Sequence, residues 1–247
     1  MIPKIIHQTW ISKDENESID KLRSTWIELN PEFVYKYYDD ADILEYLKNH
    51  FDERIQLAYN RILNGSMKAD FFRYCVLYHE GGLYIDIDIS CLKPLVKVFN
   101  FQDFHVVTAT DYCRVQRTDR IYQGFLGAEP QSMLFMNMLL FICDSMDKNL
   151  YKYNLFTLCG PIAFSTQLKQ YMNRNITTPS KRCSFLKELY FTNIHHKEHY
   201  GIITHDISKE TLVIKDNVFG KAQHKFDRGN ELHYFKHKSK YTNGYYI

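Results

Sequence analysis

The chain has 247 residues, 45% of them hydrophobic and 24% charged, with a formal net charge of +2. This is an ordinary globular composition, and it excludes disordered, collagen-like and coiled-coil chains. The balanced charge gives no reason to expect nucleic-acid binding, and the length allows one large α/β domain with or without a smaller addition.

Three features of the sequence bear on where the protein acts. The segment MIPKIIHQTW at the N-terminus has the pattern of a buried strand, not of a signal peptide. No apolar run approaches the ~20 residues that a membrane-spanning helix needs. The six cysteines are scattered without a CxxC pair, which favours reduced thiols over a zinc site or a disulfide framework. We therefore expect a cytoplasmic protein without a membrane span, in a bacterial cell or a virus-infected host.

Strands and helices are predicted to alternate along the chain. In the first part, strands are predicted at residues 4–9, 33–38 and 83–89, and helices at 20–29, 42–50, 54–60 and 66–79. In the second part, strands are predicted at 104–108, 124–128, 201–204 and 211–214, and helices at 132–146 and 161–170. The region after residue 175 is otherwise predicted to be irregular and β-like. The alternation predicts an α/β sheet whose ligands bind at the carboxyl ends of its strands.

The run GGLYIDID at residues 81–88 is the most informative motif. Side chains alternate between the two faces of an extended strand, so Ile85, Ile87 and Ile89 are predicted to share one face. Asp86 and Asp88 would then lie on the opposite face, roughly 7 Å apart. Two like charges on one face repel, and Mg²⁺ or Mn²⁺ is the simplest counter-charge for carboxylates. The alternative is an exposed edge strand with two solvated carboxylates.

The helix predicted before this strand carries a polar pair. Asp70, Arg73, Tyr74 and Leu77 are spaced i, i+3, i+4 and i+7, so they share one face of the helix. We expect Asp70 and Arg73 to reach a polar ligand together, close to the mouth of the acidic strand. The alternative is an ion pair within the helix, worth only a few tenths of a kcal/mol.

Three segments of the chain resemble glycosyltransferase family 32, the DXD-containing sugar transferases. They read IPKIIHQTW, TWIELNPEFVYKYYDD and KADFFRYCVLYHEGGLYIDIDISCLKPL, and the resemblance is nearly continuous over residues 2–95. The pattern AD-xx-RY-xx-LY-xx-GG-x-Y-x-D-x-D within them is long and specific. The catalytic segment of the clostridial glucosylating toxins is similar over the same stretch. Beyond it, the resemblance thins at Gln123-Gly124-Phe125 and Gly160-Pro161 and returns weakly near His233.

The resemblance implies a fold and an activity. The fold is GT-A, a Rossmann-like mixed α/β sheet flanked by helices, with a smaller irregular C-terminal acceptor region. A single domain over residues 1–247 is expected, with a nucleotide-sugar-binding half (1–100) and an acceptor-side half (101–247). The activity is a retaining, metal-dependent transfer of a hexose from a UDP- or GDP-linked sugar to a glycan, lipid or protein, as in polysaccharide biosynthesis. Covalent and front-face routes to retention both remain open, as does the oligomeric state.

The resemblance also implies roles for individual residues. Asp88 is expected to coordinate the metal directly, and Asp86 to contact ribose or sugar hydroxyls and bridge to the metal. Asp70 and Arg73 are expected to hold hydroxyls of the donor sugar. The surroundings of the nucleoside and the donor are expected to include Gln8, Thr9, Trp10 and Tyr84, with Trp10 available for stacking.

These residue types suit the chemistry of sugar transfer. Negative charge grows on the β-phosphate of the departing nucleoside diphosphate, and a metal ion neutralises it as a Lewis acid. Charge that is preorganised toward the transition state is typically the largest catalytic term. The sugar ring becomes oxocarbenium-like, which glycosidases meet with paired carboxylates, and Asp70 could serve similarly.

The C-terminal segment ELHYFKHKSKYTNGYY is expected to supply a further metal or phosphate contact, because family members usually carry a His followed by Ser-Trp there. His233 is the first candidate for this metal ligand and His237 the second. Ser239 is present, but Lys240 follows it in place of Trp. Lys238 or Lys240 could instead hold the diphosphate as point charges, and the remaining alternative is a basic, solvated tail.

Some further positions carry weaker expectations. Relatives often have Asn where this chain has Gln123, and the longer amide is expected to shift donor or acceptor preference. Asp111 follows a predicted strand and is a candidate for orienting the acceptor. No zinc site is expected from a histidine cluster whose spacing does not match a helix-borne pair, namely His195, His196, His199 and His205.

Two other classes of function remain open from the sequence. One is a sugar-nucleotide hydrolase or a nucleotidyltransferase on the same fold, although no Gly-rich phosphate loop near the N-terminus supports nucleotidyl transfer. The other is a non-catalytic carbohydrate-binding relict. The intact set Asp70, Arg73, Asp86 and Asp88 argues against a relict, which should lose charges that cost stability.

Overall fold

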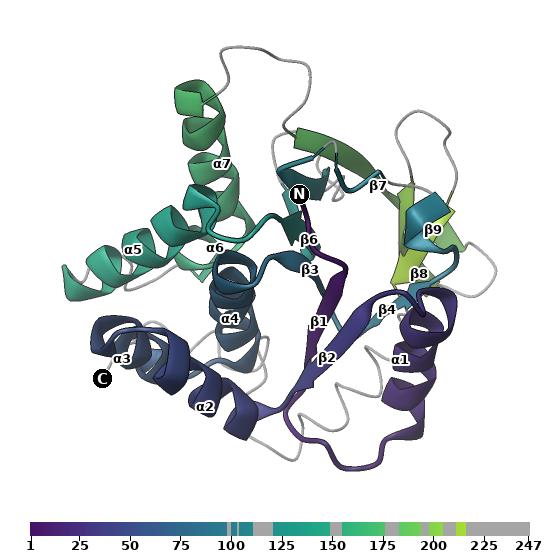
Figure 1. The fold of residues 1–247 in the computed structure, drawn as a ribbon, viewed down its shortest axis with the longest axis horizontal. Coiled ribbons are helices and arrows are strands. Elements are labelled where there is room, and N and C mark those ends of the chain that lie inside the picture. Colours follow the sequence, from purple (N-terminus) through teal and green to yellow (C-terminus); the bar gives the residue numbers. More distant parts are fainter. Residues whose placement is uncertain are drawn as a thin grey trace.

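A computed structural model of the chain describes residues 1–97, 100–102, 104–110, 121–148, 155–175, 183–193, 198–204 and 211–215. In these residues a mixed sheet runs through the molecule, with helices on both of its faces (Figure 1). The strand order is β2-β1-β3-β6-β5-β7-β8-β9-β4. The expected α/β class is thereby confirmed.

The first part of the chain follows the predicted elements closely. Its strands are β1 (Ile5–Thr9), β2 (Val34–Tyr38) and β3 (Gly82–Ile85), and its helices are α1 (Glu17–Leu29), α2 (Asp40–His50), α3 (Glu53–Arg61) and α4 (Gly65–His79). The helices begin where they do because a side chain before each accepts a backbone N–H of the first turn. These capping residues are Asn16, Asp39, Asp52 and Asn64.

The second part of the chain is more regular than the sequence predicts. It contains β4 (Ile89–Cys91), a short 3₁₀ turn (Leu95–Lys97), β5 (Val106–Thr110), β6 (Ile121–Ala128), α5 (Met133–Asp147), α6 (Leu155–Leu158), α7 (Pro161–Asn175), β7 (Cys183–Asn193), β8 (Glu198–Thr204) and β9 (Thr211–Lys215). Where it is described, the region predicted to be irregular forms strands that extend the sheet, β7 beside β5 and then β8 and β9. The sequence of β7 lacks strict alternation, and its pairing with β5 decides its structure.

The direction of the strands determines where a ligand site can form. β1 runs parallel to both β2 and β3, so the carboxyl ends of these strands meet at one edge. β6 pairs antiparallel with β3 and brings its own residues to that edge. The segment after β1 and the segment after β3 therefore lie close together, which is the usual place for a ligand in an α/β sheet.

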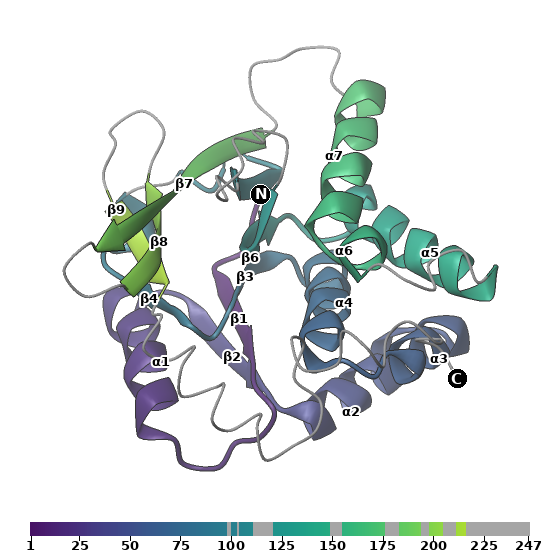
Figure 2. The ribbon, with the colours of Figure 1, turned by 180° about the vertical axis from the view of Figure 1, so that it is seen from behind.

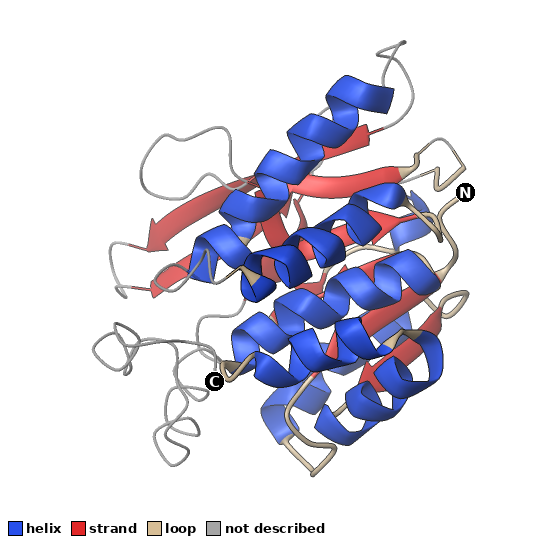
Figure 3. Ribbon diagram, turned by 90° about the vertical axis from the view of Figure 1, so that its left-hand side faces the viewer, coloured by secondary structure: helices blue, strands red, loops and turns tan. Residues whose placement is uncertain are grey.

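The two faces of the sheet are covered differently. Helices α2 to α5 and α7 lie over one face (Figure 3), whereas α1 lies on the other, beside β4 (Figure 2). Alternation along β3 places Tyr84 in the core under α4, and Leu83 and Ile85 in the core on the α1 side. Asp86 follows Tyr84 by two residues, so alternation directs its side chain toward the same face of the sheet, the face that α4 covers.

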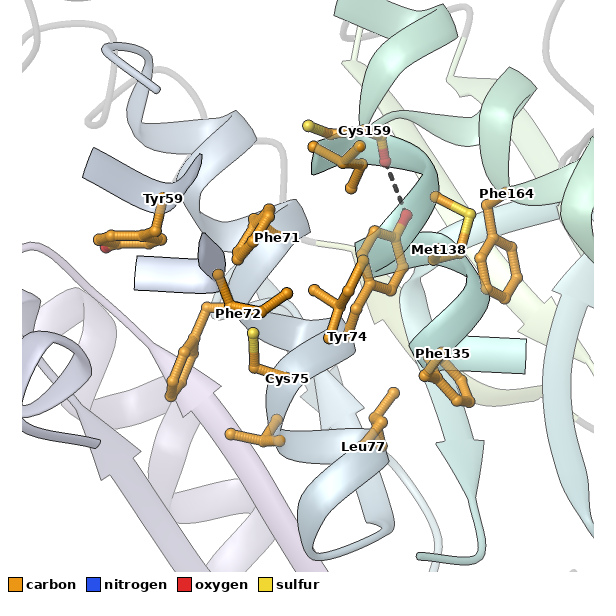
Figure 4. Close-up of a cluster of buried hydrophobic side chains, with 14 of the residues drawn as sticks. Tyr59, Phe71, Phe72, Tyr74, Cys75, Leu77, Phe135, Met138, Cys159 and Phe164 are labelled. Carbon is orange, nitrogen blue, oxygen red and sulfur yellow. Dashed lines mark hydrogen bonds between the residues drawn. The ribbon is translucent and has the colours of Figure 1, made fainter. Parts of the chain in front are cut away.

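Aromatic side chains dominate the core beneath the helices (Figure 4). Tyr74 of α4 is fully buried, stacks on Phe164 and lies at a tilt to Phe135. Its hydroxyl donates a hydrogen bond of 2.6 Å to the carbonyl oxygen of Cys159. α4 is thus fixed against α5 and α7 along its length. The cysteines Cys75, Cys91, Cys143 and Cys159 carry free thiols, as predicted.

The prediction of one continuous strand over residues 83–89 is wrong. β3 ends at Ile85, a turn follows, and β4 begins at Ile89 and pairs with β9 at the far edge of the sheet. The N–H of Ile89 donates to the carbonyl oxygen of Asp86 at 3.2 Å, which closes the turn. Ile85 and Ile89 share one apolar cluster but Ile87 joins a separate one. The same-face spacing expected for Asp86 and Asp88 therefore does not apply.

In the part of the chain that the structure describes, no helix combines the length and the apolar character that crossing a bilayer requires.

Candidate functional site

Arg73 is the centre of a buried cluster of charges. Its guanidinium Nη2 lies 3.1 Å from Asp70 Oδ1 and 3.0 Å from Asp86 Oδ1, and its side chain is only 5% exposed. Nη1 donates to the carbonyl oxygen of Gln123 at 2.6 Å. The guanidinium also lies over the Tyr84 ring, 4.7 Å from its centroid. The ion pair within the helix, which the sequence offered as the alternative, is present, but the same arginine also holds the first aspartate of the acidic turn.

A bulge in β6 makes these contacts possible. The register between β5 and β6 shifts, because Thr108 pairs with Leu126 whereas the next residue, Ala109, pairs with Tyr122. Residues 123–125 therefore bulge out of the ladder with β5. The carbonyl of Gln123 turns to Arg73, and that of Gly124 accepts the N–H of Asp86 at 2.9 Å.

Gly124 is a site residue that the sequence reasoning did not assign. An ideal Cβ at this position would lie 2.6 Å from Asp86 Oδ2 and 2.5 Å from the hydroxyl of Tyr122. Both distances are shorter than any real contact to a Cβ, so the Asp86 carboxylate occupies the space that a side chain would take. The thin resemblance at Gln123-Gly124 was the signal in the sequence that could have found it.

The charge cluster shifts the pKa of its other carboxylate. Burial raises the pKa of Asp70 to about 7, which outweighs the opposing effect of the Arg73 guanidinium, and the nearby Asp86 carboxylate raises it further. Asp70 thus shares the Arg73 guanidinium with a second carboxylate, that of Asp86. Its side chain remains 18% exposed, so it can still be reached by a polar ligand.

Three residues expected near the donor are buried in the sheet. Gln8 is fully buried, and its amide Nε2 donates to the carbonyl oxygen of Asp86 at 3.2 Å. The hydroxyls of Thr9 and Tyr84 bond each other at 2.8 Å. Burial raises the pKa of Tyr84 to about 12, so the phenol remains neutral. These side chains support the acidic turn from below, and Gln8 reaches its backbone.

Trp10 has the accessibility that a stacking role needs. Of the two tryptophans of the chain, Trp26 is fully buried and donates its ring N–H to the carbonyl of Ile89 at 2.7 Å. Trp10 is half-buried and packs with Tyr37 against a small cluster that contains Ile87. The residue between the two aspartates is therefore in the same apolar cluster as Trp10.

The longer amide of Gln123 is turned into the core. Its side chain is buried, and Nε2 bonds both the Tyr74 hydroxyl and the carbonyl oxygen of Cys159. Through its side chain it joins β6 to α4 and to the turn after α6, and through its carbonyl it holds Arg73. An effect of Gln123 on donor or acceptor preference stays a prediction.

The donor set of the turn suits a hard divalent cation. Asp86 is 28% exposed and gives Oδ1 to Arg73, while Oδ2 lies over Gly124. Asp88 lies two positions further in the same turn and is half-buried. Mg²⁺ and Mn²⁺ commonly bind through one or two carboxylates completed by substrate phosphates. The described residues contain no cluster of three or more His, Cys, Asp or Glu side chains arranged for a metal, so a pair of carboxylates is what they offer.

Several predicted positions lie outside the described residues. These are the metal candidates His233 and His237, Ser239, the lysines Lys238 and Lys240, the acceptor candidate Asp111, and His195, His196 and His205. His199 lies within β8.

Part of the chain is similar to known glycosyltransferases. Residues 16–105 match a family described as the glycosyltransferase sugar-binding region containing the DXD motif. An uncharacterized glycosyltransferase of Acanthamoeba polyphaga mimivirus is 28% identical over 183 residues, covering 72% of this chain and 68% of that protein. A mannosyl phosphorylinositol ceramide synthase of Saccharomyces cerevisiae is 28% identical over 176 residues, covering 69% of this chain but 43% of the enzyme. The match thus spans less than half of the yeast relative.

The fold also has solved counterparts. The glycosyltransferase PaToxG superposes with a TM-score of 0.56 and 20% identity, over 70% of each chain. At this identity the likeness concerns the fold alone. It confirms the expected GT-A arrangement of a mixed sheet flanked by helices.

Proposed function

Since residues 16–105 match the DXD-containing glycosyltransferases, we propose that this chain is a glycosyltransferase of the family-32 type and acts as a retaining, metal-dependent hexosyltransferase. The donor is a UDP- or GDP-linked sugar, and the acceptor is a hydroxyl of a glycan, lipid or protein. The carbohydrate product belongs to polysaccharide or glycolipid synthesis. The yeast relative is described as a mannosyl phosphorylinositol ceramide synthase, which places GDP-mannose first among the donors to test.

The single observation that carries the proposal is the sharing of Arg73 between Asp70 and Asp86. One arginine from α4 fixes a carboxylate on its own helix and a carboxylate of the turn after β3. Breaking such a buried cluster by removing one partner costs roughly 3–5 kcal/mol. A charge cluster of this kind at the carboxyl edge of the sheet supports a binding function, because burying it gives little stability in return.

Each residue has a role in this proposal. Asp88 and Asp86 would hold Mn²⁺ or Mg²⁺, which supplies Lewis-acid neutralisation of the departing diphosphate, and His233 is the proposed further ligand. Asp70 and Arg73 accept and donate hydrogen bonds to hydroxyls of the donor sugar. Trp10 stacks on the nucleoside base. The ring of Tyr84 supports Arg73 from beneath, and Gln8 and Thr9 support the turn.

The division of the chain belongs to the same proposal. Residues 1–100 supply the donor side and residues 101–247 the acceptor side of one domain. The cytoplasm of a bacterium or a virus-infected cell stays the predicted place of action, and the mimivirus relative favours the second.

Asp88→Ala tests the function directly. Turnover of the donor sugar in the presence of Mn²⁺ should fall about 10²-fold or more, because the charge on the leaving group loses its fixed counter-charge. The measurement is release of nucleoside diphosphate from a panel of GDP-mannose, UDP-galactose and UDP-glucose, with circular dichroism as the check on folding. Asp147→Ala, an exposed aspartate of α5 paired with Arg54 and Arg61, is the matched control and should keep full turnover.

Turnover of the Asp88→Ala variant at the wild-type rate would contradict the metal site. The same assay separates transfer from the alternative, a sugar-nucleotide hydrolase. A transferase releases nucleoside diphosphate faster when an acceptor is added, whereas a hydrolase releases it at the same rate with and without one.

A further inference from the structure

A line of hydrogen bonds crosses the α1 side of the sheet and ends on the acidic turn. Arg23 Nε of α1 donates to the Tyr35 hydroxyl of β2 at 3.2 Å. The Tyr35 hydroxyl donates to Gln8 Oε1 at 2.5 Å. Gln8 Nε2 donates to the carbonyl oxygen of Asp86 at 3.2 Å. We refer to Arg23, Tyr35 and Gln8 as the relay.

The two ends of the relay fix the direction of each bond in it. A guanidinium has donors only, so Tyr35 must accept from Arg23 and use its single proton toward Gln8. A peptide carbonyl has no proton, so Gln8 must present its NH₂ to Asp86 and its oxygen to Tyr35. The orientation of the buried Gln8 amide is thereby fixed at both ends, by the Asp86 carbonyl and by the Tyr35 hydroxyl, and Arg23 occupies the other side of that hydroxyl. Bonds aligned in this way also strengthen one another.

The relay acts on the turn from the side opposite to Arg73. Arg73 of α4 holds the carboxylate of Asp86, whereas Gln8 of β1 holds its carbonyl. The same carbonyl accepts the N–H of Ile89, the bond that closes the turn before β4. A change in the Gln8 amide would therefore tilt the peptide plane between Asp86 and Ile87, and with it the direction of both aspartates.

Arg23, at the end of the relay farthest from the acidic turn, is held in one position by its neighbours. Arg23 is held in place by Asp20 at 3.0 Å and stacks on the Tyr37 ring, 3.8 Å from its centroid. Burial raises the pKa of Tyr35 to about 12, so its hydroxyl keeps the proton that the relay needs. The supports of the relay thus come from α1 and β2, outside the turn itself.

We propose that Tyr35 and Gln8, aligned by Arg23, are positioning residues that set the acidic turn for cation binding, and that Gln8 acts there and not as a contact to the nucleoside. The inference rests on the proposed metal-dependent function. Residues behind the ligands of a metal site typically change its affinity by about 10–100-fold when replaced. Tyr35→Phe removes one hydroxyl from the relay and changes no residue of the acidic turn, so Asp86 and Asp88 are retained.

The test is a titration of the 247-residue chain with Mn²⁺, alone and with UDP or GDP added. The electron paramagnetic resonance signal of the free ion follows the binding. Tyr35→Phe should raise the Kd for Mn²⁺ about 10-fold, and Gln8→Met should raise it at least as much. The double variant should bind no more weakly than Gln8→Met, because Tyr35 acts only through Gln8.

The matched control is Tyr46→Phe, which removes a hydroxyl bonded to His79 at 3.0 Å on the remote α2–α4 contact. Its thermal midpoint should fall about as much as that of Tyr35→Phe, while its Kd for Mn²⁺ should equal that of the wild type. This comparison separates positioning from a loss of overall stability.

The outcomes are distinguishable. Wild-type protein that binds no Mn²⁺, with or without UDP or GDP, removes the proposed metal function and the inference with it. Wild-type protein that binds Mn²⁺ while Tyr35→Phe binds it equally well overturns the inference alone. Fully additive effects of Tyr35→Phe and Gln8→Met also overturn it, because two independent supports would then be present. If Gln8→Met does not fold, Tyr35→Phe against Tyr46→Phe still decides.

Discussion

At the scale of single residues, the position of the Asp86 carboxylate depends on the absence of a side chain at Gly124. Gly124 gives Asp86 Oδ2 the space it occupies, and any larger residue would meet that oxygen and the Tyr122 hydroxyl. Asp86 also donates its N–H to Gly124. The site thus requires glycine at this point of the bulge. The carbonyl of the same residue points toward the backbone of the acidic turn.

Gly124→Ala should therefore reduce transfer more than it reduces stability. Its methyl group would displace Asp86 Oδ2 and weaken the bond of Oδ1 to Arg73, and we expect kcat/KM to fall about 10- to 100-fold, a range typical for disturbed positioning. Steady-state kinetics and a thermal melt measure the two effects. Gly65→Ala is the control, because a Cβ there has no neighbour within 4 Å, and it should be neutral or slightly stabilising. Equal kinetics for Gly124→Ala and wild type would contradict the role of the glycine.

Part of this site could be predicted from the sequence and part could not. The proximity of Asp70 to Arg73 follows from helix spacing, and that of Tyr84 to Asp86 from strand alternation. The contact between Arg73 and Asp86 required knowing that α4 packs on the Tyr84 face of β3. The contribution of Gly124 depends on the bulge in β6, which follows from pairing with two strands at once and leaves no periodic mark.

At the scale of elements, α7 supports the bulged strand. Ser165 of α7 accepts the N–H of Ile121, where β6 begins, at 3.0 Å. The preceding residue, Phe164, is fully buried and contacts the rings of Tyr74 and Phe135. The start of β6 is therefore held by a helix whose own position depends on aromatic packing (Figure 4).

Phe164→Ala should destabilise the protein by roughly 3–5 kcal/mol, because it leaves a cavity in an aromatic core that cannot collapse around it. Urea denaturation measures this loss as a lower midpoint with an unchanged slope. Leu140→Ala on α5 is the control, since Leu140 is 40% exposed and should lose less than about 1 kcal/mol. Comparable losses for the two variants would show that α7 does not depend on this packing.

The first helices are readable from the sequence because their capping residues and apolar spacing agree. The acidic turn is not, because GLYIDIDIS alternates as well as any strand. The break at Asp86 comes from bonds to three other elements, Gly124 of β6, Gln8 of β1 and Arg73 of α4. The strands after residue 175 escape prediction for a related reason, since their partners, not their own pattern, make them strands.

At the scale of the whole molecule, a buried histidine of β1 joins this strand to β2 and to the start of β3, at one end of the sheet. His7 is fully buried, with Nε2 at 2.9 Å from the carbonyl oxygen of Gly81 and Nδ1 at 3.1 Å from the Tyr38 hydroxyl. A carbonyl only accepts, so Nε2 carries the proton and Nδ1 accepts from Tyr38. Burial lowers the pKa of His7 from 6.5 to about 4 in the folded state.

The contribution of His7 to the free energy of unfolding should therefore fall with acidification. Above pH 6.5 His7 is neutral in both states and has no effect. Between pH 6.5 and about 4 the unfolded chain takes up a proton that the folded chain does not, so stability declines by roughly 1.4 kcal/mol per pH unit, about 3 kcal/mol in all. Below about pH 4 the folded state is protonated too, and the loss from His7 levels off.

The measurement is urea denaturation of wild type and His7→Gln from pH 7 to pH 4. Asp70 titrates in the same window with the opposite sign, because its raised folded-state pKa makes the folded chain bind the extra proton. The difference between the two proteins removes that contribution. Parallel curves for His7→Gln and wild type would show that His7 does not resist protonation.

The acidic turn illustrates why a short pattern of letters is a poor detector of a binding site. Three polar groups of Asp86 have partners on different elements: its amide on one strand, its carbonyl on another, and one carboxylate oxygen on a helix. A search of unassigned proteins that demanded this trio of neighbours together with the two acids would reject most chance occurrences. It would also recover distant members whose surrounding letters have diverged beyond recognition.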